Sequence, residues 1–112
     1  MGAGFVRIVT EASFERDVLR AARPVLVAFG TSWCGPCKLM APGLRALAAT
    51  HKDALTVAKL DVDANPDFAD AWKVETYPVS ILFRDGAEVA RLDGYMALRK
   101  LEAALAPHLD AP

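Results

Sequence analysis

The sequence predicts one α/β domain over residues 1–112, built on a mixed β-sheet with helices on both faces. Two observations lead to this fold class. Apolar runs of strand length alternate with helix-like stretches through the first two thirds of the chain, which favours parallel strands joined by helices. The last third holds two strand-like segments around Asp85-Gly86 and then a final helical segment. These two strands must be antiparallel, so the sheet is mixed.

The first elements are a strand, a helix and a buried strand. Residues 5–9 are short and alternating, and Thr10 is placed to cap the helix that follows. The apolar positions of that helix are Phe14, Val18 and Ala22. Residues 25–29 form a continuous apolar run, which predicts a central strand buried on both faces.

The middle of the chain continues the alternation. We expect a turn over residues 32–36 and a long helix over 38–51, kinked at Pro42. A strand over residues 55–60 and a short helix over 67–72 follow.

The last elements are a hairpin and a helix. Residues 79–83 and 87–92 are strand-like and flank Asp85-Gly86, a strong signal for a two-residue hairpin turn. Apolar residues then recur at helical spacing, at Leu98, Leu101 and Leu105. We expect Pro107 to end this helix.

Composition and charge exclude several classes of function. The formal net charge is −1 and charges of both signs are scattered, so nucleic acid is not an expected partner. The longest apolar run covers residues 25–30, far short of the roughly 20 residues of a membrane-spanning helix. Residues 1–7 lack the pattern of a secretory signal. We therefore expect a cytoplasmic protein. We also expect it to work as a monomer.

The two cysteines, Cys34 and Cys37, are the strongest candidates for chemistry. They are too few and too close to form a disulfide framework, and they lie where a strand ends and a helix begins. Free N–H groups at that end favour the Cys34 thiolate, which is the attacking species in disulfide exchange. Cys34 would attack a target disulfide and Cys37 would resolve the mixed disulfide, so we expect Cys34 to be exposed and Cys37 buried.

Three other interpretations of the pair are weaker. Inert core cysteines seldom lie between a strand end and a helix start. A zinc site needs four ligands, and His51 and His108 lack a second paired spacing. Covalent haem attachment needs a histidine where Lys38 follows Cys37. No metal or cofactor is therefore expected.

Residues 33–38, Trp-Cys-Gly-Pro-Cys-Lys, resemble the active-site signature of the thioredoxin family, and the resemblance extends from about Phe5 to Leu105. Further matches are the helix-kinking Pro42, Lys59 on the third strand, the hairpin turn Asp85-Gly86, the cis-proline site Tyr77-Pro78 and the docking-loop residue Gly94. The resemblance implies the thioredoxin fold, a mixed five-stranded sheet with four main helices on both faces. It also implies a cis Pro78 that faces Cys34.

The same resemblance implies roles for residues and partners. Cys34 and Cys37 would be catalytic, supported by Gly35, Pro36, Lys59 and position 28. Trp33, Tyr77, Pro78 and Gly94 would bind the substrate, with Trp33 partly exposed. The expected function is reduction of protein disulfides, with thioredoxin reductase or a similar protein as electron donor and disulfide-containing proteins as targets.

The sequence departs from the family pattern at four places. Ala28 stands where the family has a buried acidic residue that carries the proton of the resolving cysteine, so this step should be slower near neutral pH. Lys59 thereby loses its partner, and it either extends to solvent or pairs with Asp61 or Asp63. Gly30 replaces an aromatic residue, which predicts a less packed and looser active-site loop.

The other two departures concern the docking surface. Tyr77 and Val79 flank Pro78 where smaller or hydroxylated residues are common, and Asp93 and Tyr95 bracket Gly94 in a patch that is usually apolar. A negative charge there should disfavour acidic targets.

Two other functions stay open at this point. A disulfide oxidase or isomerase would use the same thiols, although Gly35-Pro36 resembles the reducing members of the family. A binding or assembly module would use the thioredoxin surface alone, and the loss of the acid at Ala28 gives this hypothesis some support.

Overall fold

The computed structural model describes residues 4–109 as a five-stranded sheet flanked by helices. The elements in chain order are β1 (Arg7–Ile8), α1 (Glu11–Phe14), the π-helical segment η1 (Glu15–Leu19), β2 (Val25–Gly30), α2 (Gly35–Thr50), β3 (Thr56–Asp61), α3 (Pro66–Ala71), β4 (Val79–Arg84), β5 (Ala87–Asp93) and α4 (Leu98–Leu109). The predicted fold class is confirmed. The ends of the expected domain, 1–112, lie outside the described residues.

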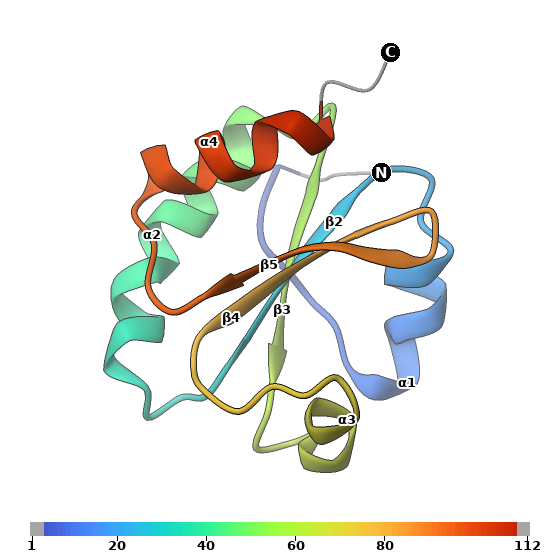
Figure 1. The fold of residues 1–112 in the computed structure, drawn as a ribbon, viewed down its shortest axis with the longest axis vertical. Coiled ribbons are helices and arrows are strands. Elements are labelled where there is room, and N and C mark those ends of the chain that lie inside the picture. Colours follow the sequence, from blue (N-terminus) through green and yellow to red (C-terminus); the bar gives the residue numbers. More distant parts are fainter. Residues whose placement is uncertain (1–3, 110–112) are drawn as a thin grey trace.

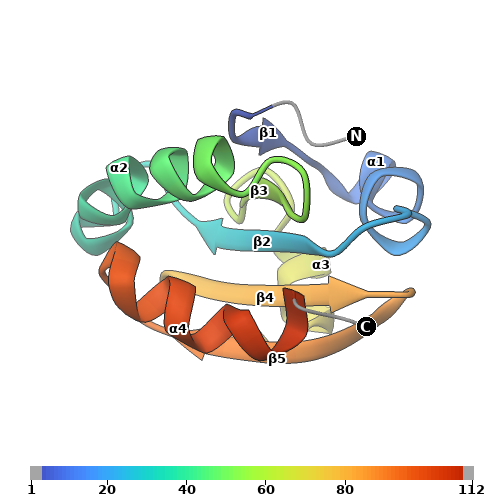
Figure 2. The ribbon, with the colours of Figure 1, turned by 90° about the horizontal axis from the view of Figure 1, so that it is seen from above.

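The sheet is mixed and has β2 at its centre. Its strand order is β1-β3-β2-β4-β5, which Figure 2 shows from β1 at the top to β5 at the bottom. Strand β2 pairs with β3 in parallel and with β4 in antiparallel orientation. Residues Val25 to Phe29 are all buried, as expected for a strand with neighbours at both edges and helices on both faces.

Alternate residues of β2 enter two separate cores, because successive side chains of a strand point to opposite faces. Val27 and Phe29 join the core under α1 and α3, whereas Leu26 and Ala28 join the core under α2 and α4. Figure 1 shows α2 and α4 together at the left, away from α1 and α3. The active-site segment between β2 and α2 is thereby anchored at one end in the sheet and at the other in a packed helix.

Helix α2 begins at Gly35, inside the turn expected over residues 32–36, and the ends of β3, α3 and β5 differ from the predictions by one residue. Three other boundaries differ for reasons that the structure shows. Strand β1 covers only Arg7–Ile8, because only these two residues have register partners on β3. The first helix is capped by Thr10 as predicted, but it widens into η1 and ends at Leu19, before Ala22. Helix α4 continues through Pro107 to Leu109, so the prediction that Pro107 ends it is wrong. A proline in the last turn removes only one hydrogen bond of the helix, which packing elsewhere can outweigh.

The hairpin prediction is confirmed. Arg84 pairs with Ala87, and Asp85 and Gly86 both have positive φ angles, 54° and 82°. Two positive φ angles define the type I′ turn, whose twist matches that of the paired strands. Within residues 4–109, no helix is long and apolar enough to cross a lipid bilayer.

Candidate active site at the junction of β2 and α2

The cysteine pair lies where β2 gives way to α2. Cys34 is the N-cap of α2, and it forms a disulfide with Cys37. The Cys34 Sγ also accepts a hydrogen bond of 3.2 Å from the Cys37 backbone N–H. Gly35 and Pro36 occupy the first turn, where the missing N–H of proline costs no helical hydrogen bond. The predicted placement of the pair at a helix start is therefore confirmed.

The burial of the two cysteines is the reverse of the prediction. Cys34 is only 6% exposed, whereas Cys37 is half-buried. The Cys34 side chain turns back over the first turn of α2, where it meets Cys37. Cys37 lies against the end of β2, where a Cβ added at Gly30 would lie 2.9 Å from the Cys37 Sγ.

The space at Gly30 is filled, contrary to the expectation of a loosely packed floor under the active-site loop. We expected the floor of the active-site loop to be loosely filled, but the Cys37 sulfur occupies the space that a side chain at position 30 would need. Any larger residue at this position would push against the sulfur. The predicted mobility of the loop stays a prediction.

A row of side chains crosses the sheet at Ala28. Its register partners are Lys59 on β3 and Ser80 on β4, and residues in register share a face of the sheet. Lys59 is exposed and forms no ion pair with Asp61 or Asp63, so it extends to solvent, one of the two alternatives left open by the sequence. Ser80 is fully buried, and its hydroxyl has no hydrogen-bond partner within residues 4–109.

Trp33 is exposed beside the disulfide, as predicted. It is 66% exposed, and its indole Nε1–H donates a 2.9 Å hydrogen bond to the Asp63 carboxylate. Its ring meets the Tyr77 ring edge to face, with 6.0 Å between the ring centroids. Asp63 was not predicted as the partner of Trp33. Parallel β2 and β3 end at the same edge of the sheet, a signal that could have predicted this contact.

The loop that precedes β4 and the loop that follows β5 meet at Pro78. The Tyr77–Pro78 peptide bond is cis, as the resemblance implied. The Gly94 N–H donates a 2.8 Å hydrogen bond to the Pro78 carbonyl, and Gly94 has a φ of 79°, which favours glycine. Asp93 and Tyr95 are exposed on either side of Gly94.

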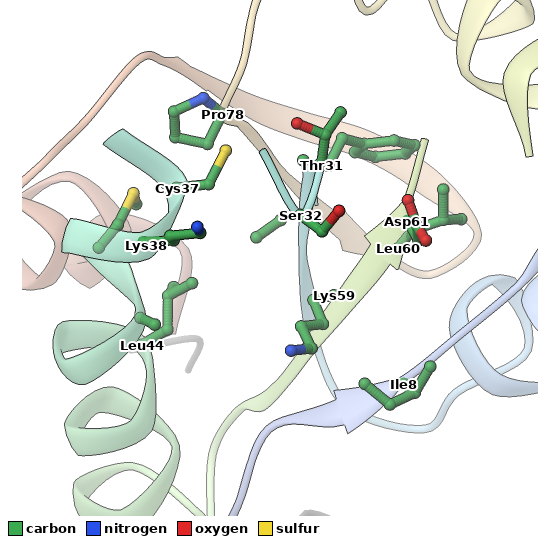
Figure 3. Close-up of a pocket in the computed structure, with 15 residues that line it drawn as sticks. Ile8, Thr31, Ser32, Cys37, Lys38, Leu44, Lys59, Leu60, Asp61 and Pro78 are labelled. Carbon is green, nitrogen blue, oxygen red and sulfur yellow. The ribbon is translucent and has the colours of Figure 1, made fainter. Parts of the chain in front are cut away.

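A cavity of about 560 Å³ separates the start of α2 from the sheet. Figure 3 shows Cys37, Pro78 and Thr31 near one end of this space and Lys59 nearer the other. Thr31 is 7% exposed, and its buried hydroxyl lacks a hydrogen-bond partner within the described part of the chain. Neither the cavity nor the position of Thr31 was predicted from the sequence, because both depend on how α2 lies over the strands.

The arrangement is suited to disulfide exchange. The disulfide closes a short ring at the N-terminus of α2, where the helix start stabilises negative charge on Cys34 when the bond is broken. No group of three or more His, Cys, Asp or Glu side chains within residues 4–109 is placed to hold a metal ion.

Comparison with known proteins places the chain in one family. The thioredoxin family model matches residues 5–107. A thioredoxin of Mycolicibacterium smegmatis is 50% identical over 103 residues, which cover 87% of this chain and 92% of that protein. A thioredoxin of Mycobacterium bovis is 52% identical over 86 residues, which cover 77% of this chain and 74% of that protein.

A third relative is larger. The bifunctional thioredoxin reductase/thioredoxin of Mycobacterium leprae is 50% identical over 92 residues, 82% of this chain but only 20% of that protein. The cysteine pair, the fold and these relatives lead to one conclusion. The chain belongs to the thioredoxin family and is a thiol-disulfide oxidoreductase that reduces protein disulfides by dithiol exchange.

Proposed function

We propose that this chain is a single-domain, monomeric and cytoplasmic electron carrier. In its dithiol form Cys34 attacks a disulfide of a target protein, and Cys37 then resolves the mixed disulfide. The observation that carries the proposal is the Cys34–Cys37 disulfide at the N-terminus of α2, next to an exposed surface. The structure holds the disulfide form, in which Cys34 is covered, and attack on a target belongs to the reduced form.

The proposed docking surface consists of Trp33, Tyr77, Pro78 and Gly94. Trp33 and Tyr77 present aromatic rings in contact with each other, and the hydrogen bond from Gly94 to Pro78 joins the two loops. An extended segment of the target would lie across these loops, held by its backbone and by contact with Trp33. Asp93 beside this surface would disfavour acidic targets by charge repulsion.

The proposed electron donor is thioredoxin reductase. The fusion of a reductase to a thioredoxin in the Mycobacterium leprae relative supports this partner. The donor would have to deliver electrons to the Cys34–Cys37 disulfide, restoring the dithiol after each target.

Insulin reduction tests the proposal. With a thioredoxin reductase as donor, the native chain should reduce insulin disulfides in many turnovers. Cys34→Ser should abolish turnover, and Cys37→Ser should leave a stable mixed disulfide between Cys34 and insulin, visible by mass spectrometry. Equal turnover by Cys34→Ser and the native chain would refute the proposal and favour a binding module.

A further inference from the structure

The cavity between α2 and the sheet has the size and lining of a small-molecule site. Its volume of about 560 Å³ lies within the range of ligand pockets, roughly 300–1,000 Å³. The lining is mostly apolar and includes Ala28, Met40, Leu44 and Leu60. A short apolar molecule could therefore enter next to the disulfide.

The sulfur that borders this cavity is that of Cys37. Figure 3 shows the Cys37 side chain pointing from α2 towards the space bordered by Pro78 and Thr31. Cys34 does not line the cavity and is 6% exposed, whereas Cys37 is half-buried. The Cys37 Sγ lies against Gly30, where an added Cβ would come within 2.9 Å of it. Of the two cysteines, Cys37 is therefore the one that borders the cavity in the disulfide form.

The cavity carries an excess of positive charge. Lys38 comes from α2 and Lys59 from β3, and Figure 3 shows both side chains extending between the helix and the sheet. Neither lysine forms an ion pair within residues 4–109. Asp61 is the single carboxylate among the lining residues. A ligand with one negative charge would therefore complement the site.

We propose that the cavity admits low-molecular-weight thiols that carry a carboxylate, and that these thiols reduce the disulfide by attacking Cys37. The thiolate forms a bond to the Cys37 Sγ, the Cys34–Cys37 bond breaks, and Cys34 leaves as a thiolate. A second thiol attacks the bound small thiol, which releases a small-molecule disulfide and the Cys37 thiolate. The cysteines take up the two protons that the two thiols lose.

This direction of attack suits the leaving group. A disulfide sulfur is displaced faster when its departing partner is a stable thiolate. Cys34 is the N-cap of α2, and its sulfur already accepts the Cys37 N–H at 3.2 Å. Attack at Cys37 therefore puts the new negative charge where the helix start stabilises it. The inference rests on the proposed function, because it assumes that the same disulfide is the working redox pair.

The first experiment measures charge selection. The oxidised chain is reduced with 3-mercaptopropionate or with neutral 2-mercaptoethanol, and the rates are corrected for the thiolate concentration of each reagent. Lys59→Gln should lower the ratio of the anionic to the neutral rate by about two- to fivefold, as expected for one partly screened charge pair. Lys100→Gln, a matched change on α4 outside the cavity, should leave the ratio unchanged. An unchanged ratio in Lys59→Gln would overturn the inference.

The second experiment identifies which cysteine sulfur reacts with a small molecule that enters through the cavity. Single-cysteine variants Cys34→Ser and Cys37→Ser react with the disulfide of 3-mercaptopropionate, and mass spectrometry follows the mixed disulfide. Adding Ala28→Leu, which fills the cavity, should slow the adduct on Cys37 at least fivefold and leave the adduct on Cys34 unchanged. If the adduct on Cys37 forms at the same rate with and without Ala28→Leu, entry through the cavity is contradicted. The Cys37→Ser background shows that Ala28→Leu still folds.

The experiments distinguish a failure of the cavity inference from a failure of the proposed function. Normal insulin reduction with a reductase, together with no selection between thiols, would overturn the cavity inference alone. Insulin reduction that survives Cys34→Ser would overturn the proposed function first.

Discussion

Ala28→Asp should accelerate the resolving step. Ala28 is 6% exposed, lies on the α2 face of β2 and lines the same cavity as Cys37. A carboxyl at this position could take the proton of Cys37 and return it. Such groups contribute roughly 10²–10⁴-fold to proton-transfer steps. We expect less than this range, on the order of tenfold, because Cys37 is half-buried and solvent already has access to it.

The same substitution should cost stability. Burial raises the pKa of a carboxyl, so the charged form is disfavoured in the folded chain. The penalty is absent at acidic pH and appears as pH rises above the unfolded pKa of about 3.9. It then grows by about 1.4 kcal/mol per pH unit until the buried carboxyl ionises in the folded chain. Lys59, the register partner of Ala28, should limit the loss by offering a positive charge, and we expect about 1–3 kcal/mol at pH 7.

The assay is insulin reduction between pH 6 and pH 9, with urea unfolding of the same samples at pH 4 and pH 7. Ala28→Asn is the matched control, because it has the same shape but cannot titrate. Acceleration by Ala28→Asp alone, with a stability loss that grows with pH, is the expected result. Equal acceleration by Ala28→Asn, or none by a folded Ala28→Asp, would refute the argument that the native chain lacks a proton carrier.

Three further substitutions test a backbone angle, an ion pair and a hydrogen bond. Lys73 has a φ of 58° after α3, so Lys73→Gly should raise the free energy of unfolding by about 0.5 kcal/mol in urea titrations. The hydrogen bond from Arg91 holds the pKa of Glu88 below its ordinary value of 4.5, so this pair stabilises the fold above pH 4.5 and loses its effect as pH falls. Glu88→Gln should therefore cost about 0.2–1 kcal/mol at pH 7 and less at pH 3, measured by thermal unfolding. Asp63→Ala should free Trp33 and raise the KM for insulin a few-fold.

Each of these substitutions has a control. Lys73→Ala keeps the unfavourable φ and should bring no gain, so an equal gain would refute the backbone argument. Glu75→Gln removes an exposed charge outside the ion pairs, and it should lack the pH dependence expected at Glu88. Asp63→Asn keeps an oxygen acceptor for the indole and should restore most of the lost affinity. A KM that stays at the native value in Asp63→Ala would exclude a role for this contact in docking.

The parts of the fold that depend on local chemistry could be predicted from the sequence. Residues 25–29 have the continuous apolar pattern of a central strand, and Asp85-Gly86 has the residue types that a type I′ turn demands. Prediction failed where a competing contact decides the outcome. Residues 5–9 have a strand pattern, but only Arg7 and Ile8 pair with β3. Pro107 is a helix breaker in isolation, yet α4 continues through it to Leu109.

In the active site, too, some features could be predicted from local sequence and others depend on packing between distant elements. Cys34 and Cys37 were identified from their spacing and position, but their burial was predicted in reverse. Ala28 and Gly30 were each expected to replace a larger residue, with separate consequences for proton transfer and loop mobility. The combined effect of the two small residues depends on where α2 lies and could not be predicted from either position alone. The Cys37 sulfur lies against Gly30 and Cys37 borders the cavity, whereas Cys34 does not, so the cysteine expected to be hidden is the one beside the proposed small-molecule site.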